Sequence, residues 1–280
     1  MPKRLSPEQV AYYRGNGFVA PVAALSEEES VKFRRRFEEY EQANRGWYGL
    51  SKGQKLYLLQ TWARDLASHP AILDAVEDVL GGDIFLWGLS LFVKDPRDPG
   101  YVSWHQDSTY WGLSEPDVVT AWVALSPSNL ESGCMKMLPG SHRLEQLPHN
   151  DTLAEHNLLT RGQEIAVEVD EREAEYLVLN PGEISLHNIR TIHGSEPNRS
   201  NERRIGVALR YIAPHVQQIN AERDSAWLVR GQDRYGHFVH ELPPKRDMDE
   251  AARAEHDRIM KLRQGILYDG VKGRPAHLES

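Results

Sequence analysis

Residues 204–212 read Arg-Ile-Gly-Val-Ala-Leu-Arg-Tyr-Ile and form the clearest β-strand pattern in the chain. Side chains alternate between two faces along a strand. One face of this segment is therefore apolar. The other carries Arg204 and Arg210 with the small residues Gly206 and Ala208 between them. The small residues leave space beside Arg204 for a ligand.

Other short segments share this strand-like composition. They are rich in Val, Ile, Leu, Trp and Tyr, and turn clusters of Pro, Gly, Asn and Asp separate them. Many short strands without intervening helices predict a sandwich or barrel rather than a parallel sheet with crossovers. With residues 204–212, the predicted strands are 17–22, 84–94, 102–107, 118–125, 134–138, 175–179 and 183–187.

Helical patterns flank these strands on both sides. Capping-box patterns at 6–9 and 26–29 predict two helices that end near Gly15 and Gly46. Further helices are expected over 70–82 and, as a solvated closing helix, over 247–265. We therefore predict one domain over residues 1–280, with a helical N-terminal part (about 1–82), a β core (about 84–215) and a C-terminal tail and helix (about 216–280).

Composition excludes several classes of protein. The 280 residues carry 33 Lys and Arg against 41 Asp and Glu, a net charge of −8, so nucleic-acid binding has no electrostatic footprint. No apolar run reaches the roughly 18 residues that span a bilayer, and the N-terminus lacks the apolar segment of a signal peptide. The single cysteine, Cys134, rules out an internal disulfide framework or a Cys-rich zinc site. A cytoplasmic protein is expected, and its oligomeric state cannot be predicted.

Residues His105 and Asp107 have the spacing of neighbouring metal ligands. Positions i and i+2 of a strand project from the same face, whereas Gln106 between them points away. The pair alone is not specific, because this spacing is common by chance. With His193 it completes two histidines and a carboxylate, the facial triad of non-haem Fe(II) oxygenases. A buried arginine such as Arg204 can anchor a dicarboxylate through two parallel hydrogen bonds.

Two of these assignments have a competitor nearby. His187 competes with His193 for the metal, and we favour His193 because Gly-Ser follows it and because of its spacing to Arg204. Arg203 competes with Arg204, but alternation places Arg204 on the face with the small residues. Arg203 is then a solvated charge.

Taken together, the motifs resemble the phytanoyl-CoA dioxygenase family. The matching elements are His105-Gln-Asp107, Ala121-Trp122, residues 133–142 (Gly-Cys-Met-Lys-Met-Leu-Pro-Gly-Ser-His), His193-Gly-Ser195 and Arg204, in the order and approximate spacing of the family over residues 5–215. The resemblance implies a double-stranded β-helix, a cupin-like jelly roll. It also implies an oxygenase that uses Fe(II), 2-oxoglutarate and O2.

The resemblance further implies a role for individual residues. His105, Asp107 and His193 would bind iron, and Arg204 would hold the distal carboxylate of 2-oxoglutarate. Ser195 and Trp122 match positions that line the co-substrate pocket, and Gln106 matches a position beside the metal. Human-type members carry an additional lysine that contacts the co-substrate. No lysine of this sequence is assigned to that contact, and Gln60 is a tentative candidate for a residue near it. Halogenase relatives lack the carboxylate ligand, so Asp107 favours hydroxylation or desaturation over chlorination.

The substrate is expected to be a small organic molecule, but the sequence does not identify it. Arg210 shares the face of Arg204 and would bind either an anionic substrate or a structural carboxylate. Tyr110, Trp111 and Arg230 are further candidates for substrate contact or for ordinary packing. A redox-silent cupin-type isomerase, hydrolase or sensor is the competing class, and it would not require Arg204. A purely structural jelly-roll module would not explain why polar residues occur at the spacing of metal ligands.

Overall fold

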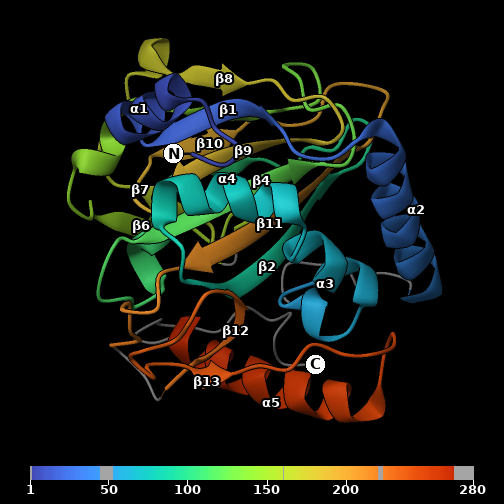
Figure 1. Ribbon diagram of the computed structural model, residues 1–280. Coiled ribbons are helices and arrows are strands. Elements are labelled where there is room, and N and C mark those ends of the chain that lie inside the picture. Colours follow the sequence, from blue (N-terminus) through green and yellow to red (C-terminus); the bar gives the residue numbers. More distant parts are fainter. Residues whose placement is uncertain (1, 45–52, 160, 220–222, 268–280) are drawn as a thin grey trace.

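The computed structural model describes residues 2–44, 53–159, 161–219 and 223–267 (Figure 1). Its helices are α1 (Pro7–Asn16), α2 (Glu27–Asn44), α3 (Thr61–Ala67), α4 (Pro70–Leu80) and α5 (Glu250–Leu267), with short 3-10 turns η1 (Leu56–Leu58), η2 (Asp107–Tyr110), η3 (Ser141–Arg143) and η4 (Glu171–Glu173). Its strands are β1 (Phe18–Ala23), β2 (Ile84–Lys94), β3 (Val102–His105), β4 (Val118–Ala124), β5 (Met135–Met137), β6 (His149–Asp151), β7 (Gln163–Ile165), β8 (Glu175–Leu177), β9 (Glu183–Asn188), β10 (His193–Ser195), β11 (Arg204–Ile212), β12 (Ser225–Arg230) and β13 (Val239–His240).

Two antiparallel sheets make up most of the β structure. The larger has the strand order β1-β9-β4-β11-β2-β12-β13, and only its last pair, β12 with β13, is parallel. The smaller has the order β3-β10-β5-β8, and β6 and β7 form a separate two-stranded ribbon. Strands that are neighbours in space are mostly distant in sequence, as expected for a sandwich or barrel rather than a series of simple hairpins.

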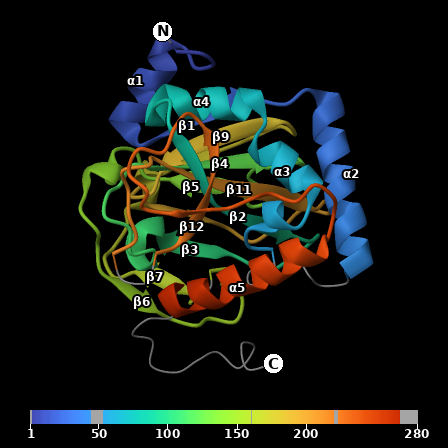
Figure 2. The ribbon, with the colours of Figure 1, turned by 60° about the horizontal axis from the view of Figure 1, so that its bottom comes forward.

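The large sheet buries its two faces in different environments. One face packs against the helices, and this hydrophobic core runs from Leu5 in the N-terminal segment to Ile259 in α5. In Figures 1 and 2, α4 lies across this face of the large sheet. The other face meets the small sheet in a second core that joins Trp122 and Ala208 to Met135 and Met137. The helices therefore cover the outside of the large sheet and leave its inner face for the site.

Strand β11 lies at the centre of the large sheet, between β4 and β2. Its register pairs Arg204 with Lys94, and Arg210 with both Gly88 and Thr120. Ile205, Val207, Leu209 and Tyr211 all belong to the core under the helices. The alternation predicted for residues 204–212 is thus confirmed, and both arginines lie on the inner face.

Helix α1 ends at Asn16, next to the predicted Gly15, and Gly17 is its C-cap at a φ of 84°. The left-handed conformation of the cap favours glycine. Two details of the predicted elements were wrong. The strand from Val102 ends at His105, and Asp107 begins the turn η2. Helix α5 is not wholly solvated, since Ile259 and Arg263 are buried.

The remaining helical predictions differ from the structure at α3 or fall outside the described residues. Helix α3 was not predicted, because its seven residues are too few to show a helical period. The predicted helix end near Gly46 lies outside the described residues. Within the described part of the chain, no helix has both the length and the apolar character needed to span a membrane.

Candidate metal centre and co-substrate pocket

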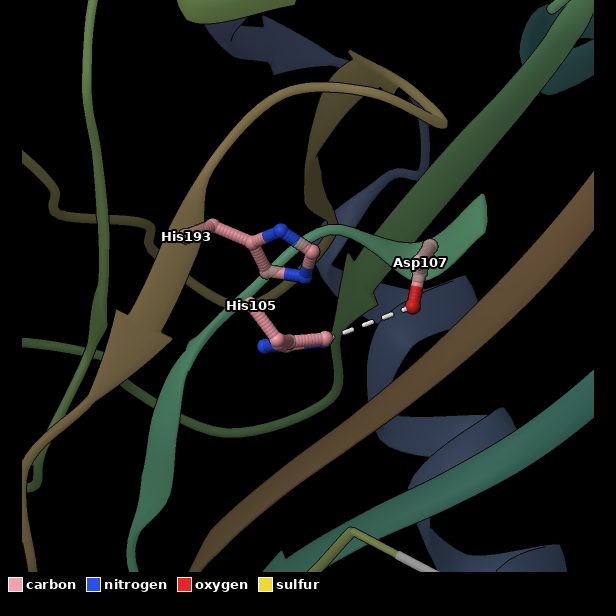
Figure 3. Close-up of side chains that lie close together, drawn as sticks. All are labelled: His105, Asp107 and His193. Atoms are coloured by element: carbon pink, nitrogen blue, oxygen red, sulfur yellow. Dashed lines mark ion pairs between the residues drawn. The ribbon is translucent and has the colours of Figure 1, made fainter. Parts of the chain in front are cut away.

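Three side chains from two strands and a turn converge between the sheets. His105 ends β3, and His193 begins β10 directly opposite it in the small sheet. Asp107 follows two residues after His105, at the start of η2. One ligand atom from each of His105, Asp107 and His193 lies within 4.8 Å of the others (Figure 3). The predicted residues are therefore brought together, with Asp107 in a turn rather than in a strand.

Both histidines are held in the same way by the backbone. Nδ1 of His105 lies 2.9 Å from the carbonyl oxygen of Ser103, and Nδ1 of His193 lies 2.9 Å from that of Thr191. Since a carbonyl oxygen only accepts, each Nδ1 donates its proton. The lone pair of each imidazole is then on Nε2, and the Nε2 atom of His105 lies 3.4 Å from Oδ1 of Asp107. Such backbone partners are typical of metal-binding histidines.

The electrostatics of the cluster also favour metal binding. Burial lowers the pKa of His193 well below its usual value, and the nearby His105 and His187 lower it further. Burial by itself would raise the pKa of Asp107, but the neighbouring His105 and the charge of Arg210 outweigh this effect and lower it. A neutral imidazole and an ionised carboxylate are the protonation states that a divalent metal requires.

A cavity of about 400 Å³ adjoins the three ligands and contains the predicted co-substrate residues. Trp122, Ser195 and Arg204 all line it. Arg204 is 1% exposed, and its Nη1 donates to the carbonyl of Gly133. Its Nε is buried without a hydrogen-bond partner among the described residues. A buried guanidinium with a free donor fits a carboxylate ligand, because buried charges need a partner.

Gly206 allows Trp122 to lie flat against β11. A Cβ atom at Gly206 would lie 1.9 Å from Cζ2 of Trp122, and the indole in turn lies 5.4 Å from the Arg204 guanidinium. We expect Gly206→Ala to lower the free energy of unfolding by about 1–3 kcal/mol, as overpacking does. Urea unfolding measures this change. Gly88→Ala on β2 is the matched control, since its Cβ would lie 3.6 Å from the nearest side chain. Equal stability losses in both variants would contradict the explanation.

Lys94 is a buried residue of this site that was not predicted. It lies opposite Arg204, and its Nζ donates to Oγ of Ser195 over 2.8 Å and to the carbonyl of Glu196. Burial opposes its charge and Arg204 repels it, which lowers the pKa of Lys94 to about 6. The signal was present in the sequence as the last residue of the 84–94 strand, but only the register of β2 against β11 brings it beside Arg204.

Lys94 makes stability depend on pH. The unfolded lysine titrates near pH 10.4 and the folded one at about 6, so between these values the unfolded chain holds more protons. The free energy of unfolding therefore rises with pH in this window, by up to roughly 1.4 kcal/mol per pH unit. This gain in stability is lost again as the pH falls towards 6. Urea unfolding from about pH 7 to pH 9 should show a shallower rise for Lys94→Met than for the wild type. Equal slopes would contradict a neutral Lys94.

His187 and Arg203, the two residues that competed with His193 and Arg204, lie outside the roles predicted for those residues. His187 also lines the cavity, with its Nε2 3.9 Å from Oδ2 of Asp107 and its Nδ1 unpartnered among the described residues. It adjoins the three-ligand cluster as a pocket residue. Arg203 forms ion pairs with Glu41 and Asp95 at the surface.

Gln106 does not contact the pocket, which corrects its predicted cofactor role. Its Nε2 donates to the carbonyls of Arg190 and Glu145, and its Oε1 accepts from the backbone N–H of Leu147. The side chain therefore ties two loops together behind the metal ligands. Gln60, the tentative stand-in for the lysine contact, is the N-cap residue of α3 and lines neither this cavity nor the one next to it.

The residues predicted to contact the substrate do not all lie in one place. Arg210 and Trp111 line a cavity next to Asp107. Arg230 does not, and its prediction is corrected: its Nη1 lies 2.7 Å from both Asp74 and Glu77 of α4, so its charge is already paired. The side chain of Tyr110 lies outside the described part of the structure.

Comparison with known proteins identifies the family. The sequence profile of phytanoyl-CoA dioxygenase (PhyH) matches residues 13–206, a span that contains the three-residue cluster and Arg204. The chain belongs to the phytanoyl-CoA dioxygenase family.

Individual relatives of the family agree with this assignment. The solved structure of the non-heme monooxygenase ThoJ in its apo form is 34% identical, has a TM-score of 0.83, and matches 92% of this chain and 97% of that one. The peroxisomal phytanoyl-CoA dioxygenase of Bos taurus is 26% identical over 79% of this chain and 72% of its own length. A probable alpha-ketoglutarate-dependent hypophosphite dioxygenase of Stutzerimonas stutzeri is 29% identical over 62% of this chain, but the match spans only 57% of that protein.

Family membership confirms the coarse predictions made from the sequence. The fold is the mainly β, double-stranded β-helix with a helical cover that the resemblance implied. The enzyme class is that of the non-haem Fe(II)- and 2-oxoglutarate-dependent dioxygenases, with O2 as the oxidant.

Proposed function

We propose that this member of the family hydroxylates, or otherwise oxidises, a C–H bond of a small organic metabolite at the site between the two sheets. His105, Asp107 and His193 hold Fe(II), and Arg204 holds the distal carboxylate of 2-oxoglutarate. The observation that supports this most strongly is that the ligand atoms lie within 4.8 Å of one another and line the same cavity as Arg204, whose Nε has no partner among the described residues.

Each residue of the chain has a defined task in this proposal. Donation from Nδ1 to a backbone carbonyl turns Nε2 of both histidines toward the metal position. Arg204 fixes the far end of the keto diacid, and the Trp122 ring and the Ser195 hydroxyl border it. Bound iron would supply O2 activation coupled to the decarboxylation of 2-oxoglutarate to succinate and CO2. The protein excludes water and keeps the reacting groups in register.

Asp107 favours hydroxylation or desaturation over chlorination. A carboxylate occupies the ligand position that halogenase relatives leave open for chloride. In this structure its carboxylate lies beside His105, and its lowered pKa keeps it ionised. An ionised oxygen ligand at that position leaves no room for a halide.

The competing function, a redox-silent isomerase, hydrolase or sensor, has less support. Such a protein would need the three-residue cluster but not Arg204. Here the buried Arg204 guanidinium lines the same cavity with a donor that has no partner among the described residues, and the chain belongs to the phytanoyl-CoA dioxygenase family. A redox-silent function leaves this arginine unexplained.

A substrate screen scored by succinate formation tests the proposal. The enzyme with Fe(II), 2-oxoglutarate and O2 is incubated with small metabolites, and Arg204→Ala serves as the negative control. With 2-oxoglutarate near the wild-type KM, succinate above the substrate-free level is expected for at least one compound with the wild type, and far less succinate is expected with the variant. A product formed without 2-oxoglutarate consumption would support the competing class instead.

We also propose that residues 1–280 form a single domain in a reducing, cytoplasmic environment. A continuous core from Leu5 to Ile259 supports the single domain, since it joins the first and last described helices to the large sheet. Cys134 is a free and buried thiol, which suits a reducing compartment.

A further inference from the structure

A second cavity, of about 570 Å³, adjoins the co-substrate pocket at Asp107. Phe92, Asp107 and Arg210 line both cavities, so the two meet at the proposed metal position. A substrate in this second cavity would reach the metal beside the co-substrate.

The second cavity contains three cationic side chains, and only one of them is unpaired. Lys55 forms a buried ion pair with Glu241, and Arg263 lies 3.2 Å from Asp224. Within the described part of the chain, no carboxylate forms an ion pair with Arg210. Asp107 attracts it from a distance, but that carboxylate belongs to the proposed metal site.

The Arg210 guanidinium is held in place by neutral groups. Its Nη1 donates to Oγ of Ser90 over 2.8 Å, and its Cζ lies 4.9 Å from the centroid of the Trp111 ring. Trp111 in turn packs against Trp87, with ring centroids 5.0 Å apart. The Nε donor of Arg210 is buried and has no partner among the described residues. The arginine is thus fixed in position while part of its hydrogen-bonding capacity stays free.

Two more polar atoms of the same lining are in this condition. Oε1 of Gln54 and Nε of Arg263 are buried without partners among the described residues. Buried polar atoms without partners are rare in folded proteins, and a buried charge without a counter-charge is costly. The amide oxygen of Gln54 accepts and needs a donor, whereas the Nε donors of Arg210 and Arg263 need acceptors. A ligand that satisfies the two arginines must offer oxygen acceptors and negative charge.

We propose that the substrate carries an oxyanion, a carboxylate or phosphonate, which binds Arg210 in the second cavity. The assignment rests on the proposed function, since it places the anion beside the metal position and the rest of the molecule along Trp111. Two parallel hydrogen bonds from a guanidinium select an oxyanion over an ester or amide of the same shape. Arg210 therefore binds substrate rather than a structural carboxylate.

The test uses matched pairs of small acids and their methyl esters, with alkylphosphonates and inorganic phosphate as separate arms. Each compound is added to the metal-free protein, and the rise in melting temperature gives its affinity. We expect certain acids to stabilise the wild type and their esters to do so far less. Arg210→Gln should weaken binding of those acids roughly 10- to 100-fold. Esters that bind as well as acids, or no acid that binds at all, would overturn the proposal.

Further variants locate the anion. Arg204→Ala should keep the acid preference, because the anion lies in the other cavity, and Arg210→Lys should keep it at lower affinity. Arg234→Gln, at an exposed ion pair with Asp83, should bind like the wild type. Acid binding lost in Arg204→Ala and kept in Arg210→Gln would place the anion at the co-substrate end and contradict the assignment. Because no metal or turnover is needed, failure of the proposed oxygenase reaction would show separately, as absent succinate.

Discussion

Asp107→Gly is expected to abolish oxidation and to weaken Fe(II) binding by more than the roughly 10- to 100-fold that follows loss of an outer partner of a metal ligand. The carboxylate is the only anionic member of the three-residue cluster. Its removal leaves two neutral imidazoles, which bind Fe(II) less tightly than a facial triad does. Succinate formation and bound iron after anaerobic dialysis measure the two effects.

Two further variants separate charge from folding. Asp107→Asn keeps the shape of the side chain and should lose activity in the same way. Asp117→Asn, which removes an exposed carboxylate 3.1 Å from His215, should retain both iron and activity. Should Asp107→Gly keep most of its activity, Asp107 would not be a metal ligand, and the placement of the site would be wrong.

Arg204→Ala is expected to raise the KM for 2-oxoglutarate about 10- to 100-fold, the cost of losing charge-assisted hydrogen bonds to a carboxylate. The guanidinium is buried, and its free Nε belongs to the cavity beside the metal ligands. Arg204→Lys should recover part of the affinity, since a lysine keeps the charge but not the two-pronged contact. Steady-state kinetics with varied 2-oxoglutarate provide the measurement.

The neighbouring arginine supplies the control. Arg203→Ala breaks surface ion pairs with Glu41 and Asp95 and should leave the KM for 2-oxoglutarate unchanged. A similar rise in KM for both variants would indicate a general disturbance of β11 and would refute the specific role of Arg204.

The sequence was sufficient for the parts of the fold that depend on local alternation. Residues 204–212 coincide with β11, because its apolar residues alternate with arginines and small residues at a clear period of two. Residues 84–94 coincide with β2, because they form a long run of strand-forming apolar residues bounded by turn signals. Strand β10 and the hairpin of β6 and β7 have only three residues each, too few to show any period. Their pairing partners, not their own residues, make them strands.

The candidate site divides in the same way. His105, Asp107, His193 and Arg204 could be predicted from motifs and from family resemblance. Lys94 could not, because it enters the site only through the register that sets it opposite Arg204. Gln106 was misplaced because its position beside two ligands says nothing of the loops that its amide binds. Arg230 was misplaced for a similar reason, since its acidic partners come from the distant helix α4.

An anaerobic titration of the protein with Fe(II) and then 2-oxoglutarate, followed by visible absorption, tests the central claim most directly. If the two histidines, the aspartate and Arg204 form one site, a weak band near the red end of the spectrum appears only when both components are present. The band should require more 2-oxoglutarate in Arg204→Ala and should be lost in Asp107→Gly. A wild-type protein that shows no band, or a band that neither substitution alters, would contradict the account.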